Sequence, residues 1–115
     1  MGIKEDLILN YKDFISSAED ELGKGKYNPA VSSYFKAIVI LCDWKIYADR
    51  NLLPKNHTER FYFLDQHYPL VYSIVNRLFE KYKDSYNIRL GKEDAVELRE
   101  NVRKVENLLG FKKSS

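Results

Sequence analysis

The sequence has few of the residues that build disulfide-bonded or metal-stabilised folds. It contains one cysteine, Cys42, and two histidines, His57 and His67, in 115 residues. A single cysteine cannot form an internal disulfide, and Cys42 lies inside an apolar run, as expected for a small buried side chain in a reducing compartment. These residues do not supply the ligands of a zinc site. We therefore expect a cytoplasmic protein with no metal and no cofactor.

The sequence also lacks a long apolar segment. No stretch reaches the ~20 consecutive apolar residues that a membrane-spanning helix needs, and the first residues are largely charged. The net charge is only +2, and acidic and basic residues are interspersed as on solvated helix faces. The composition thus argues against a membrane protein, and it neither requires nor excludes RNA as a ligand.

The size and the apolar spacing together predict the fold class. A chain of 115 residues has the usual size of one domain and can bury its own core, so residues 1–115 are expected to form a single domain with a frayed tail from about residue 111. Apolar residues recur at intervals of three and four, and no segment alternates with period two. Short connectors favour antiparallel neighbours. The sequence therefore predicts an all-α, up-and-down bundle of four to five helices.

Helix boundaries follow from caps, prolines and glycines. Asn28 with Pro29, and Asn56 with Glu59 three residues later, are typical helix starts, and Gly110 is typical of a helix end. The expected helices cover residues 3–22, 29 to about 50, 58 to about 66, 69 to about 84, and a last segment that ends near 109.

The second of these helices is apolar on most sides, which predicts that several other helices contact it. Asp43 interrupts its apolar run, so its carboxylate should be paired with Lys36, Lys45 or a tyrosine hydroxyl. We expect a shared core of six residues: Ile38, Leu41, Cys42, Leu78, Val102 and Val105.

Three segments resemble the HEPN family of small helical bundles. They are Gly23 to Ala30 after the first helix, Ser32 to Ala37 at the start of the long apolar helix, and Leu53 to Thr58 before the third helix. The resemblance covers nearly the whole chain and implies a HEPN-like bundle, commonly a homodimer. The family includes RNases, toxins paired with nucleotidyltransferase-like antitoxins, and inactive members that bind RNA, nucleotides or partner proteins.

The RNase members carry an arginine followed, after four to six intervening residues, by a histidine. Two pairs here have this spacing: Arg50 with His57, and Arg60 with His67. An arginine can hold a scissile phosphate, and a histidine can move the 2′-hydroxyl proton near neutral pH. Chance alone gives ~0.3 such matches in a chain of this composition. In the family the pair usually lies on a late helix, whereas both pairs here lie in the middle of the chain.

We therefore favour a non-catalytic interaction module that binds a protein partner, a nucleotide or RNA through Asn51, Lys55, Asn56 and Arg60. The alternative is a metal-independent RNase that uses Arg50 and His57, or Arg60 and His67. A homodimer is expected because the bundle interior cannot take all of its aromatic side chains, so some should form an exposed patch. The residues considered for this patch are Trp44, Tyr62, Phe63, Tyr68 and Tyr72.

Overall fold

The structure is a computed structural model that describes residues 2–112 and has five α-helices in that range. They are α1 (Ile3–Gly23), α2 (Tyr27–Arg50), α3 (His57–His67), α4 (Pro69–Asp84) and α5 (Lys92–Leu109). None of the described residues lies in a strand. The predicted all-α class is confirmed.

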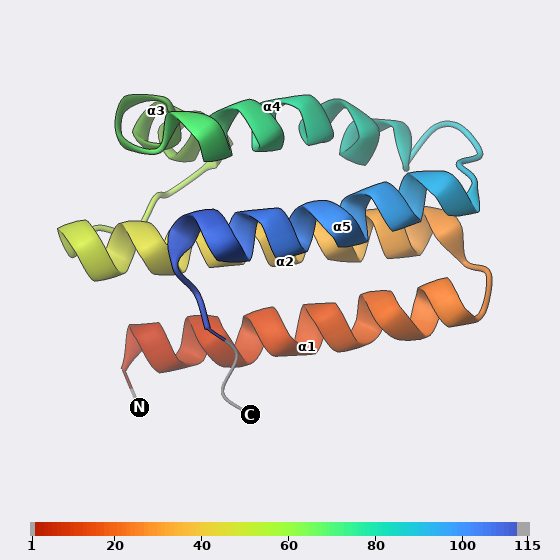
Figure 1. Cartoon of the computed structure of the whole chain (residues 1–115), viewed down its shortest axis with the longest axis horizontal. Coiled ribbons are helices and arrows are strands. Elements are labelled where there is room, and N and C mark those ends of the chain that lie inside the picture. Colours follow the sequence, from red (N-terminus) through yellow and green to blue (C-terminus); the bar gives the residue numbers. More distant parts are fainter. Residues whose placement is uncertain (1, 113–115) are drawn as a thin grey trace.

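The four long helices, α1, α2, α4 and α5, alternate in direction along the chain (Figure 1). The helices α1 and α4 run one way, α2 and α5 run the other way, and the short α3 links α2 to α4. The central helix α2 contacts all four others. The up-and-down topology predicted from the short connectors is therefore confirmed.

The core lies along α2 and the faces of α4 and α5 that meet it. The six residues predicted to share it, from Ile38 to Val105, are each at most 4% exposed. Tyr34, Phe35 and Ile46 extend the same core along α2. Among the described residues, no helix is long and apolar enough to cross a membrane.

Asn28 does not cap α2, so the predicted role of its side chain is wrong. The helix begins two residues earlier than predicted, at Tyr27, and its capping position makes no side-chain hydrogen bond. The Asn28 amide instead donates to the carbonyls of Ser85 (2.9 Å) and Ile88 (2.6 Å) and accepts from the Leu90 N–H (2.9 Å). The side chain thus satisfies three backbone groups of the α4–α5 loop, which tertiary contact alone brings to it.

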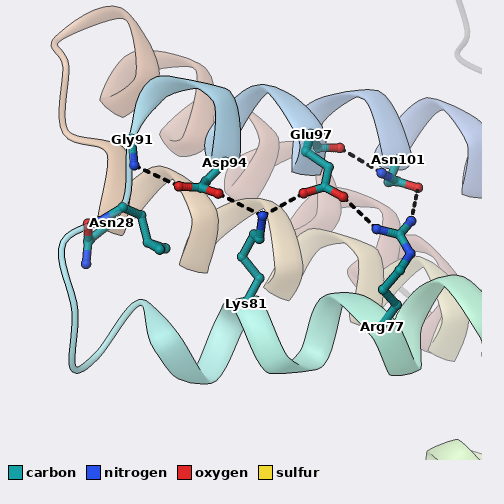
Figure 2. A network of polar contacts seen from close by, with 8 residues as sticks. Asn28, Arg77, Lys81, Gly91, Asp94, Glu97 and Asn101 are labelled. Atoms are coloured by element: carbon teal, nitrogen blue, oxygen red, sulfur yellow. Dashed lines mark hydrogen bonds and ion pairs between the residues drawn. The ribbon is translucent and has the colours of Figure 1, made fainter.

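A part-buried polar network joins α4 to α5 (Figure 2). The Lys81 ammonium donates to Asp94 and Glu97, both at 2.7 Å, and Arg77 donates to Glu97 at 2.6 Å and to Asn101 at 3.3 Å. Asp94 also accepts from the Gly91 N–H at 2.8 Å. The hydrogen bonds from Lys81 hold the pKa of the Asp94 and Glu97 carboxyls below their usual values.

The other helix ends agree closely with the sequence. The Asn56 side chain caps α3 by accepting from the Glu59 N–H at 2.9 Å. The Glu59 carboxylate reaches the Lys55 N–H at 3.3 Å, one residue before the cap, which makes this a variant of the capping box. The helix α3 is one residue longer at each end than predicted. Gly110 ends α5 in the left-handed conformation, with φ of 68°.

The expected fraying from residue 111 is wrong at Phe111. Its ring packs edge-on against Tyr11 and Trp44, with centroid distances of 5.3 and 5.2 Å. An aromatic side chain just beyond a helix end can still reach the core, and here it closes the space between α1, α2 and α5. Lys112 is exposed and lies in no helix, and residues 113–115 of the predicted tail lie outside the described residues.

Candidate functional site

The fold exchanges the partners of the two Arg/His pairs. Arg60 Nη1 lies 2.9 Å from His57 Nδ1, and Arg50 Nη2 lies 2.7 Å from His67 Nδ1. Arg60 and His57 are three residues apart on α3, so they are neighbours on one helix face. Arg50 ends α2 and His67 ends α3, and the packing of the two helices brings these residues together. Each pair selected by spacing is therefore divided between two separate contacts.

Asp43 is paired, as its position in the apolar run predicts, but its partner is Arg60. The guanidinium donates through Nε to Asp43 Oδ1 (2.6 Å) and through Nη2 to Oδ2 (2.9 Å). Both residues are buried. The partners considered from the sequence were wrong: Lys45 pairs with Asp49, and Lys36 is exposed. A planar guanidinium fits a carboxylate with two parallel hydrogen bonds, which a lysine cannot do.

The pairing of Asp43 with Arg60 determines the net charge that these two side chains bring to the site. Burial raises the pKa of the Asp43 carboxyl, and the hydrogen bonds and charge of Arg60 oppose that rise. The two-pronged geometry is that of an ionised pair, in which each charge cancels the other. Arg60 therefore contributes hydrogen-bond donors to the site without contributing net charge.

The contact with Arg60 also determines the protonation state of His57. A guanidinium has no acceptor, so His57 Nδ1 must accept the hydrogen bond and the ring proton must lie on Nε2. Partial burial lowers the pKa of His57, the charge of Arg60 lowers it further, and Asp43 partly offsets both. The ring lies against Phe79 and Phe61, with centroid distances of 5.4 and 6.0 Å. His57 is thus a neutral imidazole that offers one N–H.

An open pocket of about 400 Å³ lies beside this chain of contacts. Its apolar wall comes from α1, α2 and α4, and its polar edge comes from the start of α3 and from Lys36 on α2. Phe35 and Tyr82 stack at 4.6 Å within the wall. The helix α5 contributes no side chain to the lining. The lining residues are Phe14, Phe35, Lys36, Val39, Ile40, Asn56, His57, Arg60 and Tyr82.

The structure divides the four binding residues proposed from the sequence into two groups. Asn56 and Arg60 line the pocket. Asn51 and Lys55 lie on the exposed connector outside it, and Asn51 ends α2 in the left-handed conformation, with φ of 54°. Its backbone N–H is used by the Tyr47 carbonyl at 2.8 Å. The pocket therefore lies beside the connector face, and only its rim residues were identified from the sequence.

Lys36 and the apolar wall were missed as site residues. Lys36 is an exposed cation next to buried apolar residues of α2, and it makes no hydrogen bond or ion pair with the described residues. A lone lysine in a mostly buried helix marks the side of that helix that faces solvent. The sequence contained this signal, but it could not show that α1 and α4 leave a gap over that side.

The second Arg/His contact borders a smaller pocket of about 240 Å³ between the start of α4 and Leu108 on α5. His67 and Tyr68 form its polar edge. The Tyr68 hydroxyl donates to Asp49 at 2.5 Å, and burial together with that carboxylate raises the pKa of Tyr68 to about 12. Arg50 and His67 are both exposed. This pocket is shallow and mostly apolar, and it is separate from the one at His57.

The aromatic residues expected to form an exposed patch do not gather into one. Tyr62 is 60% exposed. The other four residues named for the patch are partly buried and pack against the core. Trp44, for example, lies edge-on to Phe111. The exposed apolar surface is found elsewhere, and it includes Leu70 and Leu108 beside the smaller pocket.

Comparison with known proteins adds no assignment to this geometry. A scan against protein-family models, a search of curated proteins and a search of solved structures each found no match. Within residues 2–112, no group of three or more histidine, cysteine or acidic side chains is placed to hold a metal ion. The arguments for function therefore rest on the pocket and on the contacts of Asp43, Arg60 and His57.

Proposed function

We propose that this chain is a non-catalytic, HEPN-like helical module that binds a protein partner, a nucleotide or RNA at the pocket and connector between α2 and α3. The observation that carries the proposal is the chain of contacts from Asp43 through Arg60 to His57 at the edge of that pocket. These contacts engage the imidazole and the guanidinium that a phosphodiesterase would need for catalysis, and they leave hydrogen-bond donors at the edge of the pocket.

His57 is poorly arranged to act as a general base. A base must accept the proton of the attacking hydroxyl, and that requires a free ring nitrogen within ~3 Å of it. Here Nδ1 is bonded to Arg60, and Nε2 carries the ring proton. Freeing Nδ1 would break its hydrogen bond with the Arg60 guanidinium. The arrangement supports a hydrogen-bonding role for His57.

Arg60 is equally poorly arranged to hold a phosphate. Its charge is balanced by Asp43 at 2.6 Å, and a phosphate would have to compete with that buried carboxylate. The alternative RNase would therefore depend on Arg50, which lies at the other end of α3 and contacts His67. The distances within one chain support binding more than cleavage.

The pocket supplies the features of a binding site. It combines a predominantly apolar wall with a few convergent polar groups, as ligand sites commonly do. Its aromatic rings could contact a flat ligand such as a nucleobase, or an apolar side chain of a partner. Exposed leucines beside the smaller pocket offer a separate surface for a second copy, which supports the proposed homodimer.

Cleavage and binding can be measured on the same labelled single-stranded RNA in EDTA. We expect the wild type to cleave no more RNA than the His57→Ala variant does. We also expect any RNA binding measured by fluorescence anisotropy to weaken steeply as the salt concentration rises. Circular dichroism confirms that each variant is folded. Cleavage that disappears in both Arg50→Ala and His57→Ala, with both variants folded, would establish the RNase alternative.

The homodimer is tested by light scattering at high micromolar concentration. We expect the mass of two chains, because Leu70 and Leu108 lie together beside the smaller pocket and offer apolar surface that a second copy can cover. A mass of one chain over the whole concentration range would remove the homodimer from the proposal and leave the binding pocket, which one chain completes, unaffected.

A further inference from the structure

We infer that the pocket between α1, α2, α3 and α4 is a site for a small aromatic monocarboxylate. This inference rests on the proposed binding function and narrows it to one class of ligand. It follows from three properties of the lining residues: the net charge, the balance of donors and acceptors, and the shape of the apolar wall.

The lining carries one uncompensated positive charge. Arg60 is neutralised by Asp43, and His57 is neutral because its Nδ1 accepts from a guanidinium. Lys36 has no hydrogen-bond or ion-pair partner among the described residues. Among the described residues that line the pocket, none is acidic, and Glu59 on α3 points its carboxylate to the backbone of Lys55. The electrostatics therefore favour a ligand with a single negative charge.

The polar edge offers donors and has its side-chain acceptors engaged. The Oδ1 of Asn56 accepts from the Glu59 N–H, and Nδ1 of His57 accepts from Arg60. What remains for a ligand is the Asn56 amide N–H₂, the His57 Nε2–H, the Lys36 ammonium and the guanidinium N–H groups of Arg60 that bond neither Asp43 nor His57. A carboxylate only accepts, so it matches this edge. A ligand rich in hydroxyl or amino donors would bury some of them without a partner, which is unfavourable.

The rest of the pocket is apolar. Phe14, Val39 and Ile40 complete the wall that Phe35 and Tyr82 begin. The volume of about 400 Å³ lies at the small end of the range of about 300–1,000 Å³ that is usual for ligand sites. Aromatic rings pack favourably on one another when stacked with an offset or edge-on. A compact aromatic body with one carboxylate therefore satisfies both the wall and the edge.

Amide NMR spectra of the full chain test the inference with three probes: 2-naphthoate, its neutral analogue 2-naphthamide, and adenosine monophosphate. We expect 2-naphthoate to shift the resonances of residues 35–40 and 56–60 saturably. The neutral amide should bind about fivefold more weakly, because it lacks the ion pair with Lys36, and the exposure of that lysine to solvent keeps the difference small. Adenosine monophosphate should bind more weakly than 2-naphthoate.

Two pocket variants and one control sharpen the test. Lys36→Met should remove the preference for 2-naphthoate over 2-naphthamide. Ile40→Glu should abolish binding of 2-naphthoate, because a carboxylate four residues from Lys36 on the same helix face would pair with that lysine. Lys104→Met removes an exposed, unpartnered lysine on α5, outside the pocket, and should behave as the wild type.

Several results would overturn the inference. Equal affinities for the acid and the amide, a preference that survives Lys36→Met, shifts centred outside the pocket, or no saturable shift with any probe would each do so. Tighter binding of adenosine monophosphate at the same residues would also overturn it, while the proposed binding function would stand. RNA cleavage by the wild type in EDTA would overturn the proposed function itself, whatever the probes show.

Discussion

Replacing Arg60 with methionine should strongly destabilise the fold, because it leaves the Asp43 carboxylate buried without a partner. The two side chains are only 9% and 11% exposed, so water cannot replace the lost hydrogen bonds. Removing one member of a buried ion pair usually costs about 3–5 kcal/mol. Small domains have unfolding free energies of about 5–15 kcal/mol, so Arg60→Met should be folded but marginal.

The pH dependence identifies the carboxylate as the cause. Without the guanidinium, burial is the dominant influence on Asp43, opposed only by the weaker effect of His57, and the pKa of the carboxyl in the folded state rises further above the value of about 3.9 in the unfolded chain. The folded state then binds more protons than the unfolded state as the pH falls. The unfolding free energy of Arg60→Met should therefore increase between pH 7.5 and pH 5.5, relative to that of the wild type.

Urea unfolding followed by circular dichroism measures these quantities. The double variant Asp43→Leu, Arg60→Met should regain much of the lost free energy, because it buries no charge. Lys24→Met, which breaks an exposed pair with Asp20, is the control and should cost no more than about 1 kcal/mol. A loss below about 1 kcal/mol in Arg60→Met, or a double variant as unstable as that single variant, would refute the reasoning.

Three further predictions concern the core, the imidazole and the loop. Leu41→Ala should lower the unfolding free energy by about 2–5 kcal/mol through the cavity it leaves, since Leu41 is 1% exposed; a loss in the surface range of about 0.5 kcal/mol would contradict its placement. In an NMR titration His57 should have a pKa below about 6.5, and this pKa should rise in Arg60→Met. Because the folded state then binds fewer protons than the unfolded state, the wild type should lose stability as the pH falls from about 6.5 through the pKa of His57 in the folded state. A pKa of His57 that is the same in Arg60→Met as in the wild type would show that the two side chains do not interact. Asn28→Ala should accelerate amide hydrogen exchange in residues 85–91 and leave α1 protected, and exchange rates equal to those of the wild type would show that the asparagine does not hold the loop.

The local structure of this chain was largely legible in the sequence. Helical spacing of apolar residues predicted five helices, and Asn56, Pro69 and Gly110 marked boundaries that the structure confirms. These signals work because a cap or a helix-breaking residue acts on backbone groups within one turn of itself. The six core residues were predictable for the same reason, since a face that is apolar at helical spacing has to be buried.

The partners of polar side chains were decided by the tertiary structure. Asn28 had the sequence context of a cap, but it binds loop groups about sixty residues away. Asp43 was expected to need a partner, and the crossing of α2 and α3 made that partner Arg60, seventeen residues away, in place of a nearer lysine. Hydrogen bonds of polar side chains depend on which helix faces meet, and spacing along the chain does not specify that.

The candidate site shows the same division. The sequence indicated the α2–α3 connector, two arginines and two histidines as candidate site residues. The spacing rule paired each arginine with one histidine, but in the fold each arginine contacts the other histidine. The pocket itself exists because α1 and the α3–α4 layer leave part of α2 uncovered beside Lys36. The residue types and the apolar faces of the helices could be predicted from the sequence. The gap between helices, and with it the chemistry that the site can perform, is a property of their packing alone.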